Sequence, residues 1–301
     1  MTPPTGTQYR IASDDQEVTV VEVGAGLRTY TAGGVDVLDG YGEDERCAGG
    51  RGQLLLPWPN RIRDGRYRFD GEDQQLALTE PSRHNASHGL ARWMNWTAAV
   101  HEPDRVVMEL VLHAQPGYPF VLGLSVEYRV GVAGLSVATT ATNLGDRPCP
   151  YGAGAHPYLT VGTDLVDDAV LEAPGSSWLQ ADDRGIPVGS APVAGTPFDF
   201  RRARPIADLV LDTAFTGLEG DEVVLADAAG ERRVTLWLDA SYRWLMLFTG
   251  DTLEPARRRR GLAVEPMTCP PNAFATGEGV RVLEPGEAWT TMWGLRPARA
   301  R

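Results

Sequence analysis

Short runs in which apolar and polar residues alternate fill most of the chain. A period of two places successive side chains on opposite faces of an extended backbone, so these runs predict half-buried β-strands. The clearest example covers residues 134–139, with the sequence Gly-Leu-Ser-Val-Ala-Thr. Strands are predicted at residues 17–23, 66–69, 92–100, 105–113, 121–130, 135–142, 222–226, 232–238, 244–249 and 288–295.

Turn residues separate these runs, and a helical period is nearly absent. The chain has 34 glycines and 22 prolines, and segments such as Asn143-Leu144-Gly145-Asp146 are typical of turns. Only residues 205–211 suggest a helix, of about two turns. The arginine run at 257–260 is interpreted as a solvated loop. The pattern predicts an all-β fold, a large antiparallel sandwich or barrel, with residues 1–301 as a single domain.

The net charge and the cysteine content limit which kinds of binding partner and cell compartment are expected. The net charge of −12 argues against nucleic acid and against an anionic membrane, because both attract a basic protein surface. The N-terminal segment is polar, and no apolar stretch approaches the roughly 18 residues of a membrane span. The three cysteines, Cys47, Cys149 and Cys269, contain no C-x-x-C pair. We therefore expect reduced thiols and a cytoplasmic protein.

Two segments place one titratable side chain each beside a proline. His156 follows the small residues Gly152-Ala153-Gly154-Ala155, which allow close approach of chain or substrate, and precedes Pro157. Glu265 follows the apolar run 261–264 and precedes Pro266. Desolvation on a buried strand would raise the carboxyl pKa, which suits a general base. A buried structural histidine and a carboxylate paired with an arginine are the alternative interpretations.

Two other segments have features of ligand binding. In Pro57-Trp58-Pro59-Asn60-Arg61, a stiff loop presents an amide and a guanidinium before a hairpin-like Asp64-Gly65 turn. His88 precedes Gly89, where backbone could approach a ligand closely. A proline-stiffened surface turn explains the first segment equally well. His84, His101 and His113 lie in polar surroundings and are interpreted as surface residues.

Several reaction classes lack their motifs. The chain has no G-x-S-x-G, no Walker loop, no G-x-G-x-x-G and no H-E-x-x-H. No carboxylate pair of the glycosidase type stands out among the 40 acidic residues. Acid–base chemistry without a cofactor or metal is the expectation that remains.

Taken together and in order, these segments resemble the aldose 1-epimerase family, the galactose mutarotases. The resemblance begins at Val21-Glu22-Val23-Gly24-Ala25-Gly26-Leu27-Arg28, similar to the family's opening hairpin, and includes Pro59-Asn60-Arg61-Ile62 and His88-Gly89. It continues through Gly154-Ala155-His156-Pro157-Tyr158, Leu211-Asp212-Thr213-Ala214-Phe215 and Val264-Glu265-Pro266. It implies a large antiparallel β-sandwich that interconverts the anomers of a free aldose.

The resemblance also implies residue roles. His156 would be the general acid and Glu265 the general base, placed on opposite sides of the C1–O5 unit of the sugar. Arg61, His88 and Asp212 would bind sugar hydroxyls, with Asn60 supporting Arg61. The implied partner is a monosaccharide, and either a monomer or a homodimer is compatible with the sequence.

Departures from the family pattern leave the substrate open. Leu90, Leu159 and Met267-Thr268-Cys269 stand where the family often has other residues, which suggests a divergent bacterial-type branch. One alternative is an epimerase of a phosphorylated or sulfonated hexose, for which Arg51, Arg63, Arg83 and Arg92 are candidate anion ligands. The other alternative is a sugar-binding protein of the same fold without catalysis.

Overall fold

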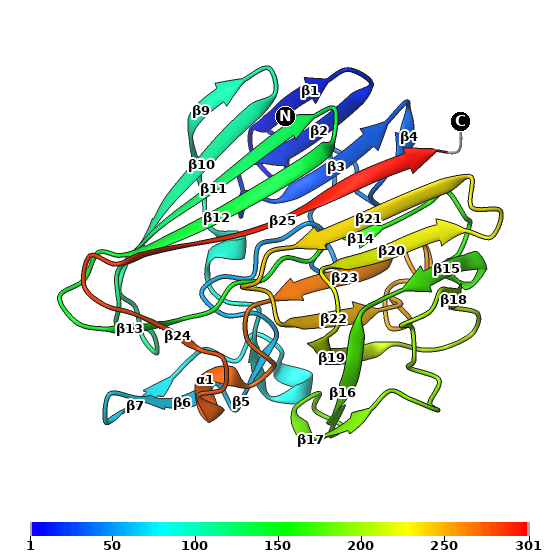
Figure 1. The fold of residues 1–301 in the computed structure, drawn as a ribbon. Coiled ribbons are helices and arrows are strands. Elements are labelled where there is room, and N and C mark those ends of the chain that lie inside the picture. The colour runs from blue at the N-terminus through cyan, green and yellow to red at the C-terminus, as the bar shows by residue number, and fades with distance from the viewer. Residues whose placement is uncertain (1, 300–301) are drawn as a thin grey trace.

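Antiparallel sheets make up most of the regular structure (Figure 1). The computed structural model describes residues 2–299. A four-stranded sheet has the order β1 (Gln8–Ser13), β2 (Gln16–Val21), β3 (Leu27–Ala32) and β4 (Val35–Asp36). A six-stranded sheet has the order β14 (Tyr158–Leu159), β23 (Leu262–Met267), β22 (Trp244–Phe248), β19 (Asp212–Leu218), β16 (Gly175–Ala181) and β17 (Pro187–Pro192).

The largest sheet crosses the whole molecule. Its nine strands have the order β18 (Arg204–Pro205), β15 (Ala169–Glu172), β20 (Glu222–Asp227), β21 (Arg232–Leu238), β25 (Ala288–Arg299), β12 (Gly134–Asn143), β11 (Leu122–Gly131), β10 (Arg105–Leu112) and β9 (Thr97–Glu102). Figure 1 shows the four-stranded sheet beside one part of it and β14, β23 and β22 beside another.

The remaining elements are short. Three strand pairs join β5 (Arg61–Arg63) to β8 (Asn85–Ser87), β6 (Arg66–Phe69) to β7 (Glu72–Gln75) and β13 (Cys149–Tyr151) to β24 (Arg281–Leu283). The helical elements described are the 3-10 helices η1 (Pro81–Arg83), η2 (Ala91–Trp93) and η3 (Val166–Asp168), and the α-helix α1 (Ala273–Thr276). No helix in residues 2–299 has the length and apolar character needed to cross a membrane.

Alternation along the strands builds the core. In β12, buried positions alternate with half-exposed ones from end to end, as the sequence predicts for residues 134–139. One cluster of buried side chains includes Val20, Val126 and Leu247, which come from the four-, nine- and six-stranded sheets. The prediction of an all-β antiparallel sandwich is confirmed.

Strand β23 departs from this alternation because both its faces are covered. All six of its residues are buried, and it lies between β14 and β22. The apolar sequence Leu262-Ala263-Val264 fits a strand without a solvent face. Glu265 continues the same strand and is opposite Met246 in β22. The fold therefore places this carboxyl in the interior.

One predicted element is wrong and another is only partly right. Residues 205–211 form no helix, since Ile206 and Ala207 donate backbone hydrogen bonds to Ala169 and Asp167 rather than along a helical turn. Residues 92–96 do not belong to a strand of the large sheet, since β9 begins at Thr97. At Ile206 and at Trp96, whose amide donates to the Glu22 carbonyl, hydrogen bonds to distant segments replace the predicted local pattern.

The Asp64-Gly65 turn forms, but it does not close a hairpin. Both residues have positive φ, 56° and 62°, as two-residue hairpin turns require. However, β5 on one side pairs with β8, whereas β6 on the other side pairs with β7. The turn therefore redirects the chain from one strand pair to the next.

The arginine run at 257–260 is only partly solvated, which corrects the prediction of a solvated loop. Arg259 is 11% exposed in its side chain and pairs with Asp167 and Asp251, at 2.8 Å each. Its guanidinium also donates to the carbonyl oxygens of Ala207 (2.7 Å) and Leu209 (3.3 Å). Arg259 thus links three loops beside the six-stranded sheet.

We predict that Arg259→Ala lowers the free energy of unfolding by about 2–3 kcal/mol, because it leaves two partly buried carboxylates and two carbonyls without their donor. Urea unfolding followed by fluorescence measures the change. Arg258→Ala is the matched control, because Arg258 is exposed and should change stability by less than about 0.5 kcal/mol. Equal losses in the two variants would contradict the role given to Arg259.

Candidate active site

All six site residues predicted from the sequence line one cavity. The cavity has a volume of about 780 Å³ and includes His156, Glu265, Asn60, Arg61, His88 and Asp212. They come from segments that are far apart in the chain. Asn60 and Arg61 lie at the start of β5, His88 follows β8, His156 precedes β14, Asp212 begins β19 and Glu265 is in β23.

Backbone packing fixes the position of His156. Its amide donates to the Gln53 carbonyl at 3.0 Å, and its carbonyl accepts from Gly52 at 2.9 Å. A Cβ at Gly154 would lie 2.8 Å from Cβ of Pro59 and 3.0 Å from the Pro266 carbonyl oxygen. The run of small residues before His156 therefore lets neighbouring backbone segments approach closely.

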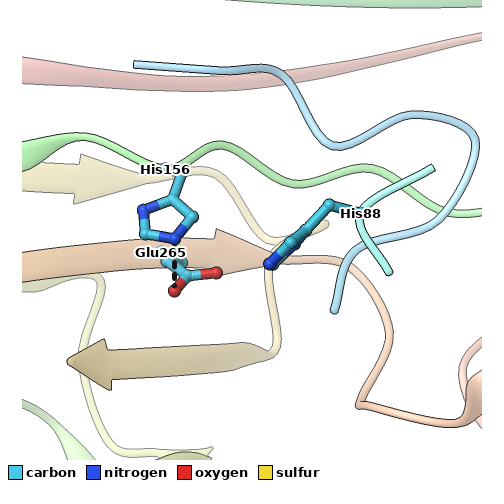
Figure 2. Close-up of side chains that lie close together, drawn as sticks. All are labelled: His88, His156 and Glu265. Carbon is cyan, nitrogen blue, oxygen red and sulfur yellow. Dashed lines mark ion pairs between the residues drawn. The ribbon is translucent and has the colours of Figure 1, made fainter. Parts of the chain in front are cut away.

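His156 and Glu265 form a buried pair (Figure 2). The imidazole Nε2 lies 3.3 Å from Oε1 of Glu265, and the two side chains are only 6% and 3% exposed. The imidazole is stacked on the Tyr158 ring, with centroids 5.1 Å apart and planes within 8°. The acid and base candidates are therefore in direct contact, and their placement on opposite sides of the C1–O5 unit of a sugar stays a prediction.

Burial favours the neutral form of both members of the pair. It lowers the pKa of His156 to about 3, and the nearby guanidinium groups of Arg51, Arg92 and Arg61 act in the same direction. Burial also raises the pKa of Glu265 well above 4.5, and the Asp212 carboxylate adds to this while Arg61 opposes it. Between these two pKa values the pair holds one proton.

His88 completes a group of three side chains that converge in Figure 2. Its ring centroid is 5.5 Å from that of His156, and its amide donates to the Asn60 carbonyl at 2.8 Å. Burial lowers the pKa of His88 well below 6.5, so the ring is neutral. Its Nδ1 and Oε2 of Glu265 are buried without a hydrogen-bond partner in the described residues.

Arg61 is held in place by a carboxylate that sequence reasoning missed. Glu80 accepts from Nε at 2.8 Å and from Nη2 at 3.1 Å. The third nitrogen, Nη1, lies 3.9 Å from Asp212. Asp212 also contacts Arg83, at 3.4 Å. A bidentate pair fixes the plane of the guanidinium, so Glu80 orients Arg61 in the cavity wall.

Asn60 supports its neighbours, as expected. Its backbone is left-handed, with φ at 56°, and its side-chain oxygen accepts from the Arg61 amide at 2.9 Å. Asn60 is 2% exposed and also binds the amide of His88 through its carbonyl. One residue thus joins the two loops that carry Arg61 and His88.

The same group of three could also bind a metal ion. His88, His156 and Glu265 each offer one possible ligand atom, and these three atoms lie within 4.8 Å of one another. Two imidazoles and a carboxylate are a common donor set for transition metals. A metal there would occupy the atoms that proton transfer needs. The expectation that the protein uses no metal stays a prediction.

Sequence reasoning missed further residues that the cavity brings together. Gly50, with φ at 78°, faces the His156 ring, and a Cβ there would lie 2.6 Å from Cδ2. Arg46 and Glu80 also line the cavity. The Gly49-Gly50 pair was a usable signal for close approach, whereas nothing local in Thr79-Glu80-Pro81 marks Glu80. The other three histidines, His84, His101 and His113, are exposed as predicted.

Comparisons with known proteins agree with the fold and identify the family. "Uncharacterized protein YihR" of Escherichia coli K12 is 33% identical over 283 residues, covering 94% of this chain and 90% of that protein. "Aldose 1-epimerase" of the same organism is 28% identical, covering 80% of this chain and 78% of its own. The crystal structure of a GalM/aldose epimerase homologue from C. elegans superposes with a TM-score of 0.88 at 21% identity, covering 98% and 99% of the two chains. The family model for aldose 1-epimerase matches residues 7–295, and the chain therefore belongs to the aldose 1-epimerase family.

Proposed function

We propose that this protein, as one domain of residues 1–301, interconverts the α and β anomers of a free aldose by acid–base ring opening and closure. The observation that carries the proposal is the buried pair of His156 and Glu265 at the wall of a cavity of about 780 Å³. The volume suits a monosaccharide. Family membership supports the same reaction class.

The reaction needs a base and an acid close together. The anomeric hydroxyl oxygen O1 and the ring oxygen O5 are both bonded to C1. Glu265 removes the O1 proton while His156 protonates O5, so the C1–O5 bond breaks and an aldehyde forms. Rotation about C1–C2 turns the other face of the aldehyde toward O5, and the reverse proton transfers close the ring. The 3.3 Å contact between Nε2 and Oε1 fits two target oxygens on one carbon.

A single shared proton supplies both roles. In the neutral form the proton is on Glu265, and transfer across the Oε1–Nε2 contact gives the carboxylate and imidazolium that the reaction uses. The hydroxyl of a bound sugar hydrogen-bonds to the carboxylate and favours that ionised form. Ring opening moves the proton from O1 to Glu265 and from His156 to O5, so the pair ends with the same proton count.

The remaining residues orient the sugar. Arg61 and Asp212 offer donor and acceptor groups on one wall, and the neutral His88 offers its ring nitrogen beside the pair. Asn60 holds the two loops together. Positioned acid–base groups contribute about 10²–10⁴-fold each, provided that the substrate is held in a reactive orientation.

The location in the cell is part of the proposal. The three cysteines Cys47, Cys149 and Cys269 are free and buried, as a reducing compartment would allow. We therefore propose the cytoplasm. The net charge of −12 supports a small-molecule substrate over a nucleic-acid partner.

Replacement of the base tests the proposal. We expect Glu265→Gln to lower kcat by at least about 10²-fold, because the amide cannot accept the O1 proton. Polarimetry and NMR with fresh α-glucose and α-galactose measure the rate above the spontaneous background. Glu109→Gln, on the exposed face of β10, is the matched control and should keep wild-type activity. A wild-type protein that binds sugars but accelerates no aldose would instead support the non-catalytic alternative.

The protonation state of the pair predicts a pH dependence of stability. The folded pKa of Glu265 is raised above 4.5, so above that pH the folded protein holds a proton that the unfolded chain has lost. The free energy of unfolding therefore falls with rising pH, by up to about 1.4 kcal/mol per unit, until the folded pKa is passed. His156, with its pKa lowered to about 3, acts with the opposite sign between about pH 3 and 6.5.

Glu265→Gln isolates the glutamate contribution. The variant keeps His156 but lacks the carboxyl group whose ionisation lowers the free energy of unfolding as pH rises. Its stability relative to wild type should therefore increase from about pH 5.5 to about pH 7.5. Urea unfolding of both proteins at several pH values gives the difference. A difference that stays constant across this range would mean that Glu265 is already ionised in the folded protein.

Close packing against His156 gives a separate prediction. We expect Gly50→Ala to reduce kcat by about 10-fold or more, because the new Cβ would displace the imidazole from Glu265. Gly71→Ala is the matched control. Gly71 has nearly the same φ, 79°, but nothing lies within 4 Å of its added Cβ. It should share the backbone strain of the first variant and keep its activity. Equal activity losses would show that strain, and not contact with His156, is responsible.

A further inference from the structure

The cavity carries positive charge in a strongly acidic protein. The whole chain has a net charge of −12. Yet four arginines line the cavity, Arg46, Arg61, Arg83 and Arg92, against three carboxylates, Glu80, Asp212 and Glu265. Burial raises the pKa of Glu265 and thus favours its neutral form, which widens the imbalance. A neutral sugar would leave this charge uncompensated.

Arg92 is the least compensated of the four. It lies in η2 and is half-buried, so its guanidinium has lost part of its hydration. Among the described residues its guanidinium makes no ion pair or hydrogen bond, and it lies 5.7 Å from the centroid of the Trp93 ring. The Glu80 carboxylate attracts this guanidinium without forming an ion pair with it, and both Glu80 oxygens are already bound by Arg61. A half-buried, unpaired guanidinium is costly unless a ligand neutralises it.

Arg46 and Arg83 extend the same positive surface. Arg46 is exposed and makes no ion pair within residues 2–299. The side chain of Arg83 is 32% exposed, and its ion pair within residues 2–299 is with Asp212, at 3.4 Å. Arg51 and Arg63, the other two candidate anion ligands from the sequence, are already paired with carboxylates. Arg51 pairs with Asp39 at 2.9 Å and Arg63 pairs with Asp182.

We infer that Arg92, together with Arg46 and Arg83, forms a subsite for a tetrahedral oxyanion carried by the aldose, so that the substrate is an anionic hexose. The inference rests on the proposed function, since it places the reacting end of that sugar at His156 and Glu265. Guanidinium groups bind such anions through paired N–H donors. A phosphate and a sulfonate share this chemistry, with three terminal oxygens each.

The subsite is close enough to influence the acid–base pair. The positive charge of Arg92 contributes to the lowered pKa of both His156 and His88. An anion bound to Arg92 cancels this charge, which makes protonation of His156 easier. An anionic substrate would thus favour the ionised form of the pair that the reaction uses, and a neutral sugar would not.

The test compares three sugars that differ at C6: α-glucose, α-glucose 6-phosphate and the 6-deoxy-6-sulfonate of glucose. NMR exchange spectroscopy gives kcat/KM for each above the spontaneous rate. We expect at least one anionic sugar to exceed glucose by about 10-fold or more. Arg92→Gln should reduce the ratio of anionic to neutral kcat/KM by about 10- to 100-fold. Arg63→Gln, outside the cavity, is the control and should leave every rate unchanged.

The outcomes separate this inference from the proposed function. If wild type accelerates glucose but prefers neither anionic sugar, the subsite is wrong and the epimerase proposal stands. If no sugar is accelerated, the proposed function itself fails. An unchanged ratio in Arg92→Gln would also overturn the subsite. Preference for the sulfonate or for the phosphate identifies which oxyanion the arginines select.

Discussion

The structure depends on a carboxyl group and an imidazole that are both withdrawn from water. Glu265 belongs to a strand with no solvent face, and His156 is 6% exposed beside it. An isolated charge there would be strongly disfavoured, so the two groups share one proton and remain in contact. The fold surrounds the pair closely. Tyr158 stacks on the imidazole and Gly50 lies against it, which leaves the ring little freedom.

Burial and pairing also divide the cavity into three electrostatic regions. Near the pair, His88 and His156 are held neutral. Around Arg61 the charges are matched, because Glu80 takes two of its nitrogens. Toward Arg92 and Arg46 they are not matched. An enzyme for neutral sugars needs only the first two regions, since hydroxyls are bound by balanced donors and acceptors. The positive charges of Arg92 and Arg46, which no carboxylate of the described residues balances, are therefore the feature of the cavity that bears on the charge of the substrate.

The sequence predicted the all-β class and a set of residues that line one cavity better than it predicted contacts. His156, Glu265, Arg61 and His88 were marked by local signals, such as a proline or glycine beside a polar side chain, and the cavity contains them all. Glu80 carried no such signal. Its role depends on Arg61, which lies on the strand that pairs with β8 and is 19 residues away in the chain. Contacts of this kind follow from sheet register, which local composition does not encode.

The errors in the prediction have the same origin. The Asp64-Gly65 turn has the geometry expected of a hairpin, yet each flanking strand finds a better partner elsewhere. Ile206 has helical spacing but is buried against the neighbouring strand, where its amide binds Ala169. In each case long-range burial outweighed local propensity.

The same non-local packing explains why the substrate is harder to predict than the reaction. The proposed proton transfer needs an acid and a base close to one carbon atom. Glu265 on a buried strand and His156 after a run of small residues could both be identified from local sequence patterns. Substrate charge depends on which arginines lack a partner. Arg51 and Arg92 were equal candidates in the sequence, but within residues 2–299 Arg51 pairs with Asp39 and Arg92 pairs with no carboxylate. The proposed selectivity for an anion thus rests on a guanidinium that the fold leaves without a carboxylate partner.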